Sequence, residues 1–129
     1  DEDLVALINT TEEQIAAIFN HLEDDIAHRR LPRVLAVISD AYKDDSGRDF
    51  AAVKQFLAAA FRDYREIHVT RTPPKFTTQG SEVRAIETLG VIGEPESGKV
   101  PPFSFQGNVS ITLRRVQDTW QITKLQLLQ

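Results

Sequence analysis

Residues 103–128, FSFQGNVSITLRRVQDTWQITKLQLL, decide the fold of this chain. Apolar side chains take alternate positions in the first half of the stretch: Phe103, Phe105, Val109, Ile111 and Leu113. Polar side chains stand between them, and a period of two is typical of a β-strand with one buried face. Asp118 indicates a short polar turn, in which it can adopt a left-handed backbone more easily than most residues, and Trp120 and Ile122 then resume an apolar strand. We therefore predict a long closing β-hairpin, onto which the earlier parts of the chain fold.

Helical patterns come before this hairpin. Thr11-Glu-Glu-Gln14 fits a capping box, and apolar residues follow at helical spacing, which predicts a helix of about five turns ending near Arg30. Pro32 favours the first turn of a second, short helix that runs through Ile38. A third helix is predicted from near Asp49, with one apolar side made of Phe50, Val53, Phe56, Leu57, Phe61 and Tyr64.

Strand patterns fill the rest of the chain, at Glu66–Thr72, at Glu82–Ile92 and in the closing hairpin. Three main helices followed by a run of strands predict an α+β fold, in which the helices pack on one face of a mainly antiparallel sheet. The chain has 129 residues, enough for one hydrophobic core, and no linker divides it. We therefore predict a single domain over residues 1–129.

The composition narrows the function. The chain has no cysteine, which excludes disulfides, thiolate metal sites and cysteine nucleophiles. Its net charge of −4 argues against a nucleic-acid partner, and no apolar run approaches the roughly 20 residues that span a membrane. The sequence lacks even an initiator methionine, so the location stays open. The alternatives are a periplasmic or secreted protein whose signal peptide has been removed, and a cytoplasmic protein.

The order of these patterns resembles the nuclear transport factor 2-like superfamily, also called the SnoaL or ketosteroid isomerase-like cone, with a cystatin-like fold. Four segments carry the resemblance: the capped helix ending at AHRR, LPRVLAVIS with DAYKDDSG, RDFAAVKQFLAAAF, and ITLRRVQDTWQITKLQ. It implies a strongly curved sheet that wraps the helices around an apolar pocket. The superfamily contains isomerases, dehydratases, an epoxide hydrolase, transport adaptors and many bacterial members of unknown role. The resemblance therefore implies a fold without a particular function.

Six aromatic residues are the candidates for lining such a pocket: Tyr42, Phe56, Phe61, Tyr64, Phe105 and Trp120. The alternative for the whole set is ordinary core packing, because aromatic residues mainly supply burial. Our leading interpretation is a non-catalytic domain that binds a small apolar ligand or a partner, without a cofactor.

The alternative function is an enzyme of the ketosteroid isomerase or dehydratase type. In an ungapped comparison, DAYKDDSG falls where ketosteroid isomerases carry their general base, which places Asp45 as the base, with Tyr42 as a second acid–base residue. That chemistry also needs an oxyanion hole made by a tyrosine and a protonated aspartate. The same comparison puts His21 and Thr112, or a neighbour of Thr112, at those positions. The competing interpretation is that Asp40, Asp44 and Asp45 form a turn and cap the third helix.

Two other motifs predict no site. Gly93–Lys99 has the spacing of a phosphate-binding loop, but Val100 replaces the required hydroxyl and the next two prolines prevent a helix, so we predict a hairpin loop. His21, Asp25 and His28 share one side of a helix. The two histidines are about 10 Å apart along the axis, too far for one ion, so we predict histidine–carboxylate pairing and no metal.

The closing strand raises a question of phase. If Trp120 and Ile122 face the core, strict alternation sends Leu125 and Leu127 to the outer face. Either a β-bulge resets the phase, or the outer face carries an apolar patch. Uncharged residues also occupy the outer positions of the preceding strand: Ser104, Gln106, Asn108, Ser110 and Thr112. Such a surface can meet its own copy, and related cones pair in this way, so we predict a homodimer through the outer sheet face.

Overall fold

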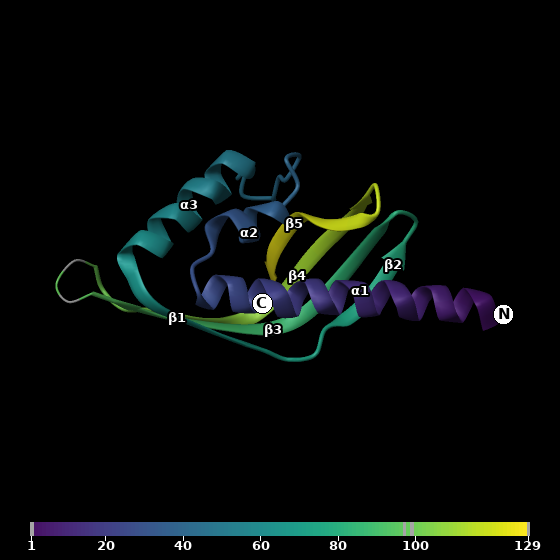
Figure 1. Cartoon of the computed structure of the whole chain (residues 1–129), viewed down its shortest axis with the longest axis horizontal. Helices are drawn as coiled ribbons and strands as arrows, with labels where there is room; N and C mark the ends of the chain where they lie inside the picture. Colours follow the sequence, from purple (N-terminus) through teal and green to yellow (C-terminus); the bar gives the residue numbers. More distant parts are fainter. Residues whose placement is uncertain (1, 97, 99, 129) are drawn as a thin grey trace.

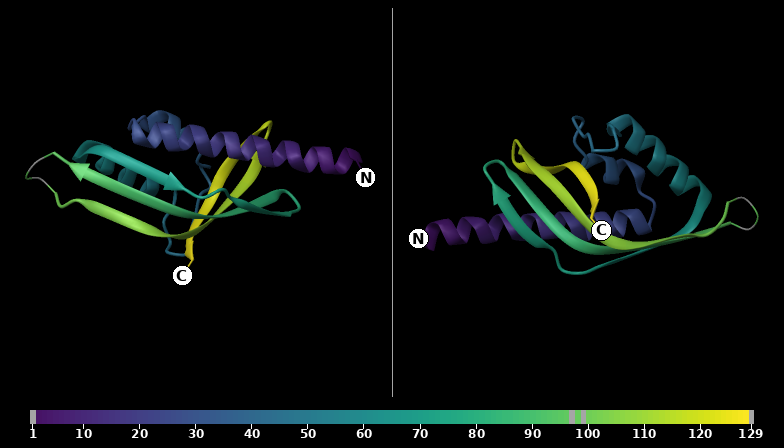
Figure 2. Two further views of the ribbon diagram at one scale, coloured as in Figure 1. Left: turned by 90° about the horizontal axis from the view of Figure 1, so that it is seen from below. Right: turned by 180° about the vertical axis from the view of Figure 1, so that it is seen from behind.

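The computed structural model describes residues 2–96, 98 and 100–128, with the backbone alone for residues 2–10. Its helices are α1 (Glu2–Ala27), α2 (Leu31–Ala36) and α3 (Phe50–Asp63). Its strands are β1 (Tyr64–Arg71), β2 (Lys75–Gln79), β3 (Glu82–Pro95), β4 (Phe103–Val116) and β5 (Thr119–Leu128). All strand pairs are antiparallel, in the order β1-β3-β4-β5, and β2 pairs with β3 beyond the end of β1. The predicted α+β class is confirmed: the three helices lie on one side of a curved sheet (Figures 1 and 2).

Helix α1 starts earlier than predicted. It begins at Glu2 and passes through Thr11 without a break, so the predicted start at Thr11 is wrong. Residues 2–10 form the preceding turns, whose carbonyl groups accept the amide hydrogen bonds that a cap would otherwise satisfy. The predicted apolar stripe does form. Ile15 is 0% exposed and Phe19 is 2% exposed, which fixes α1 on the sheet.

The second and third helices follow the predictions more closely. Helix α2 ends at Ala36, short of Ile38, because the backbone of residues 37–39 pairs with β5: the Ile122 amide donates to the Val37 carbonyl, and the Ser39 amide donates to the Ile122 carbonyl. Helix α3 begins next to Asp49, as predicted. Its cap is Asp49 itself, whose side chain accepts a hydrogen bond from the Ala52 amide at 2.9 Å, so the capping role suggested for Asp40, Asp44 and Asp45 is wrong.

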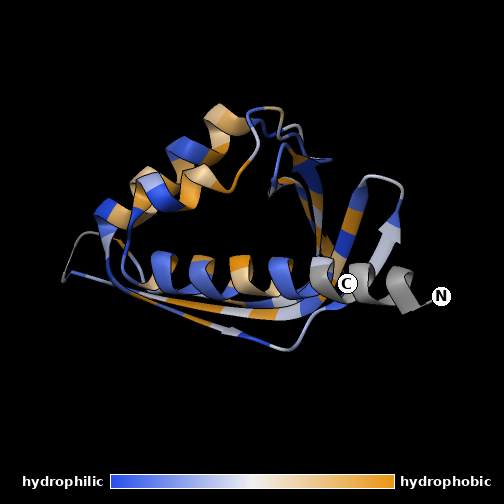
Figure 3. Cartoon of the chain, turned by 45° about the vertical axis from the view of Figure 1, so that its right-hand side comes forward, coloured by the Kyte–Doolittle hydropathy of each residue, from blue (hydrophilic) through white to orange (hydrophobic). Residues whose placement is uncertain are grey.

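The inner face of the sheet carries the alternation that the sequence predicts. Its residues join α1 and α2 in one core: Ile15, Phe19, Val34, Ile38, Tyr42, Val83, Ala85, Val109, Ile111, Leu113, Trp120 and Ile122. Figure 3 shows hydrophobic and hydrophilic bands following one another along the strands. Two details differ from the predictions. Gln117, not Asp118, takes the left-handed conformation in the hairpin turn (φ 58°), and β2 was not predicted.

A β-bulge decides the phase of β5. Leu113 pairs with Ile122 and Thr112 pairs with Lys124, so Thr123 has no partner in the register. Leu125 then stands opposite Ile111, on the inner face, and Leu127 follows it two positions later. Of the two alternatives, the bulge is therefore correct, and these leucines give the outer face no apolar patch. The homodimer itself stays a prediction.

Candidate functional site

The side of α3 that faces the sheet is apolar but incompletely covered. Its stripe of Phe50, Val53, Leu57 and Phe61 packs against the core cluster, yet no residue of α3 is fully buried. The inner face of the sheet has a matching set of partly buried side chains, which includes Leu89, Phe105 and Leu125. Apolar side chains normally bury themselves when the chain alone can cover them. These apolar side chains of α3 and of the sheet therefore keep part of their surface accessible to water.

Two of the six predicted aromatic residues belong to the core itself. Trp120 and Tyr42 are each 6% exposed, and the Trp120 Nε1–H donates to Gln14 Oε1 at 3.2 Å. Phe61 and Phe105 are partly buried and pack against the same cluster from α3 and β4. These four residues come together on the inner side of the sheet, as a pocket or a core would require.

The remaining two aromatic residues lie elsewhere. The Tyr64 ring meets the Phe103 ring edge-on, with centroids 6.5 Å apart, near the far end of the β3–β4 ribbon. Phe56 is 60% exposed and is not among the side chains packed on the core. The reason is helical geometry: one residue turns the side chain by about 100°, so Phe56 points away from the stripe that contains Leu57.

A surface pocket of about 280 Å³ lies between the loop of residues 44–48 and the end of β5. Its lining is Asp44, Asp45, Ser46, Arg48, Leu125, Gln126 and Leu127. The bulge at Thr123 brings the two leucines to this side of β5. Both residues of the catalytic alternative, Asp45 and Tyr42, are at or beside this pocket, so their surroundings decide what they can do.

Asp44 holds the loop together. Its Oδ1 accepts hydrogen bonds from the Ser46 amide (3.0 Å), the Ser46 hydroxyl (2.6 Å) and the Arg48 amide (3.1 Å). Its Oδ2 accepts from the Tyr42 hydroxyl at 3.0 Å. These donors, Ser46 first, lower the pKa of the Asp44 carboxyl. Asp44 therefore forms the turn that was one of the two interpretations of the aspartate cluster.

Asp45 is exposed and already paired. Its Oδ1 lies 2.8 Å from Lys124 Nζ, and its Oδ2 accepts a hydrogen bond from the Gln126 side chain. The hydrogen bond from Lys124 is the main reason why the pKa of Asp45 is lowered. A general base that works near neutral pH needs a raised pKa, which an apolar environment supplies. Asp45 lacks that environment in this structure.

Tyr42 links the loop of residues 44–48 to β5 through hydrogen bonds. Its hydroxyl donates to Asp44 and accepts a hydrogen bond from the Leu125 amide at 3.3 Å. Burial, followed by the neighbouring Asp44, raises the pKa of Tyr42 to about 12. A phenol with so high a pKa keeps its proton at neutral pH. The surroundings of Tyr42 thus favour a structural role.

The sequence reasoning did not single out Glu87, which is a buried carboxylate. Its side chain is 2% exposed on the inner face of β3, and its Oε2 lies 3.3 Å from Arg71 Nη1. Arg71 also donates to Glu23 (3.2 Å) and Asn20 (2.7 Å) of α1. Burial raises the pKa of Glu87, against the opposing effect of Arg71. The signal was available, because Glu87 continues the inward-facing positions of Val83 and Ala85.

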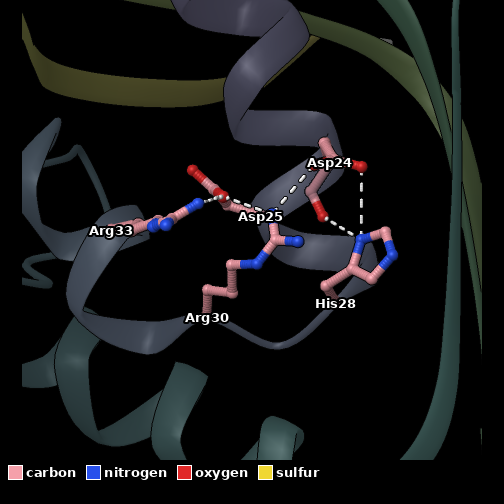
Figure 4. A network of polar contacts seen from close by, with 5 residues as sticks. All are labelled: Asp24, Asp25, His28, Arg30 and Arg33. Carbon is pink, nitrogen blue, oxygen red and sulfur yellow. Dashed lines mark hydrogen bonds and ion pairs between the residues drawn. The ribbon is translucent and has the colours of Figure 1, made fainter.

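The histidine–carboxylate group on α1 belongs to one network of polar contacts, in which Arg30 binds both Asp24 (2.9 Å) and Asp25 (Figure 4). His28 Nδ1 lies 3.2 Å from Asp24 Oδ1, whereas Asp25 pairs with Arg30 (3.0 Å) and Arg33 (3.7 Å). A histidine–carboxylate pair does form at the helix edge, between His28 and Asp24, whereas Asp25 of the predicted group binds arginines instead. In the part of the chain that the structure describes, no three histidine, aspartate or glutamate side chains converge as metal ligands.

Two further observations concern segments discussed above. Within Gly93–Lys99, residues 93–95 belong to β3, and Ser97 and Lys99 lie outside the described residues. Across the described helices, none combines the length and apolar character that crossing a bilayer requires.

Comparison with solved structures shows the fold. The chain is similar to a nuclear transport factor 2-like superfamily protein from Salmonella enterica, with a TM-score of 0.79 and 11% identity over 94% of this chain and 92% of that one. It is similar to a candidate scytalone dehydratase from Novosphingobium aromaticivorans (TM-score 0.78, 12% identity, 96% and 87% covered). A candidate dehydratase from Streptomyces avermitilis gives a TM-score of 0.77 at 11% identity, with 92% and 96% covered.

These likenesses establish that the chain has the nuclear transport factor 2-like cone fold. No sequence model of a protein family matches the chain, and no curated protein matches it by sequence. At such identities the fold is shared and the chemistry is not established by it. Enzyme and binding roles both stay open for this chain, so the function has to be argued from the side chains described above.

Proposed function

We propose that this protein binds a small apolar molecule between α3 and the inner face of the sheet. The observation that carries the proposal is the apolar stripe of α3, which packs on the core although no residue of the helix is fully buried. A ligand would cover the apolar surface that the chain leaves accessible, and removing that surface from water is favourable. Apolar walls with a few polar groups at one end are typical of small-molecule sites.

Thermal unfolding in the presence of flat and elongated apolar molecules tests this proposal. A ligand that binds only the native state must raise the midpoint, by an amount that grows with ligand concentration. We expect at least one such molecule to do so. Replacing Leu57 with glutamine should reduce the shift, because Leu57 lies in the stripe that faces the sheet.

Phe56→Gln is the matched control, since Phe56 is adjacent in sequence but 60% exposed and lies outside the stripe that packs on the core. Each variant is compared with its own midpoint without ligand, which separates binding from a change in stability. The proposal is wrong if no apolar molecule raises the midpoint, or if both variants lose the shift equally.

The catalytic alternative has the names of two similar structures in its favour, since both are candidate dehydratases. In this chain, however, the surroundings of Asp45 lower its pKa and those of Tyr42 raise its pKa, and neither change suits acid–base work near neutral pH. The carboxylate with a raised pKa is Glu87, which is paired with Arg71 beneath α1. We therefore place binding before catalysis.

We also propose that the chain forms a homodimer through the outer face of its sheet. Ser104, Gln106 and Asn108 are exposed on that face, and Ile92, paired with Ser104, is 50% exposed. Ser110 and Thr112 are buried within the chain and can add little to a partner contact. Light scattering should report about twice 14.5 kDa. Ile92→Glu should give a monomer, because it would place an unpaired charge in the interface.

Val116→Glu is the control for this experiment, because Val116 is 40% exposed at the hairpin tip, away from the proposed contact. A monomer of the unchanged protein at high micromolar concentration would rule out the homodimer. If the Ile92→Glu variant remains dimeric, the dimer interface lies on a surface that does not include Ile92.

A further inference from the structure

The pocket beside β5 has one charged group without a partner. Arg48 is exposed, and its guanidinium makes no hydrogen bond or ion pair with any described residue. Its backbone amide does bind Asp44, which fixes the residue at the rim of the pocket. A guanidinium fixed at its backbone and free at its tip is suited to bind an incoming carboxylate through two parallel hydrogen bonds.

The acidic residues of the same pocket are already satisfied. The two oxygens of Asp44 accept four hydrogen bonds, three from Ser46 and Arg48 of the loop and one from the Tyr42 hydroxyl. Asp45 is neutralised by Lys124 at 2.8 Å and also bound by Gln126. Asp44, Asp45, Arg48 and Lys124 have a summed formal charge of zero, so the group without a partner decides which ligand charge is favoured. That group is the Arg48 guanidinium.

The other wall of the pocket is apolar. Leu127 is 66% exposed although it faces the inner side of β5, and Leu125 packs against the core cluster. Leu125 therefore belongs to the pocket wall and also to the side chains packed on the core cluster, which include the apolar stripe of α3. A ligand whose apolar part lay along these leucines could place a polar end group at the rim, beside Arg48.

We propose that the natural ligand is an amphipathic acid, with an apolar body against Leu125 and Leu127 and a carboxylate paired with Arg48. This inference rests on the proposed function and adds the chemical class of the ligand to it. The pocket volume of about 280 Å³ is just below the usual range of ligand sites, roughly 300–1,000 Å³. The size suits a short acid, or the acidic end of a longer molecule that continues into the interior.

Calorimetric titration with three molecules of one chain length tests the inference: octanoate, octanol and octylamine. We expect octanoate to bind most tightly. Arg48→Gln should weaken octanoate binding about fivefold and leave octanol binding unchanged, because a partly exposed ion pair contributes modestly. Arg48→Lys should retain part of the preference for octanoate, since it keeps the charge without the planar fork.

Arg65→Gln is the matched control, because it removes the same charge from an exposed position on β1. It should leave the affinity for octanoate unchanged. Amide chemical shifts of residues 44–48 and 125–128 should move with octanoate, which locates the binding.

The remaining outcomes separate this inference from the function on which it rests. Equal binding of octanoate and octanol, with no effect of Arg48→Gln, overturns the inference and leaves the apolar-ligand proposal intact. Tighter binding of octylamine overturns it in favour of a cationic ligand at Asp44 and Asp45. Failure of all three probes, while another apolar molecule raises the unfolding midpoint, also overturns the inference alone. Failure of every apolar molecule overturns both.

Discussion

Replacing Leu113 with alanine is expected to lower the free energy of unfolding by about 3 kcal/mol. The substitution removes buried apolar atoms, so the folded protein loses their transfer free energy and also keeps an unfilled cavity. Leu113 is 0% exposed in the middle of the core. It pairs with Val83 on one side and Ile122 on the other, so three strands lose contacts together. Urea unfolding followed by circular dichroism measures the change as a shift of the midpoint at constant slope.

Val116→Ala is the control for this variant. Val116 belongs to the same strand but is 40% exposed, and an exposed apolar side chain contributes little. We expect its effect to stay within about 0.5 kcal/mol. Equal losses in the two variants would mean that burial at Leu113 is not what stabilises the hairpin.

The success of this part of the prediction has a simple physical basis. In a strand with one buried face, every second side chain is apolar and points to the core. Val109, Ile111 and Leu113 could therefore be assigned to the core from the sequence alone. The start of α3 near Asp49 was equally predictable, because a helix cap depends on one side chain and the backbone of the next turn. Features that depend on neighbours in sequence were therefore predictable.

Features that depend on distant segments were not. The positions of Trp120, Ile122, Leu125 and Leu127 in the sequence suggested a β-bulge as one of two alternatives. Its location at Thr123, however, depends on other segments of the chain. The Thr123 carbonyl accepts a hydrogen bond from the amide of Lys43, a residue far away in the sequence. Strand β2 was missed for a similar reason. Its five residues are largely polar, and it is stabilised by pairing with β3 and not by a pattern of its own.

The candidate site divides in the same way. The resemblance to ketosteroid isomerases drew attention to Asp45 and Tyr42. The causes of their pKa shifts, Lys124 beside Asp45 and the burial of Tyr42 next to Asp44, could be assigned only in three dimensions. Arg48 gave no signal at all, because a lone arginine in a loop is ordinary. It gained meaning once Leu125 and Leu127 were found on the other side of the same pocket.

Arg71→Leu is expected to destabilise the protein by about 3–5 kcal/mol at neutral pH, the usual cost of leaving a buried charge without its partner. Arg71 is only 14% exposed and binds the 2%-exposed Glu87 side chain, so water cannot replace it. It also joins Glu23 and Asn20 to the sheet, and its guanidinium lies 5.7 Å from the centre of the Phe19 ring. Denaturant unfolding at pH 7 measures the loss.

The dependence of this loss on pH identifies its cause. Burial raises the native pKa of Glu87 above 4.5, so the native state holds the proton more tightly than the unfolded state. Its contribution to stability is therefore fully present below the unfolded pKa and is lost as pH rises through the native pKa. Without Arg71 the native pKa rises further. The difference in free energy of unfolding between Arg71→Leu and the unchanged protein should then become smaller as the pH falls from 7 towards 4.5. Both proteins are measured at each pH.

A second substitution separates the buried charge from the other contacts of Arg71. Glu87→Gln keeps the shape of the side chain and removes its charge, so the double variant with Arg71→Leu should recover much of the lost stability at pH 7. The loss that remains would come from the contacts of Arg71 with Asn20, Glu23 and the Phe19 ring. If the double variant is no more stable than Arg71→Leu, and the gap does not change with pH, the uncompensated charge of Glu87 is not the cause. The ion pair would then stabilise the cone mainly through its link to α1.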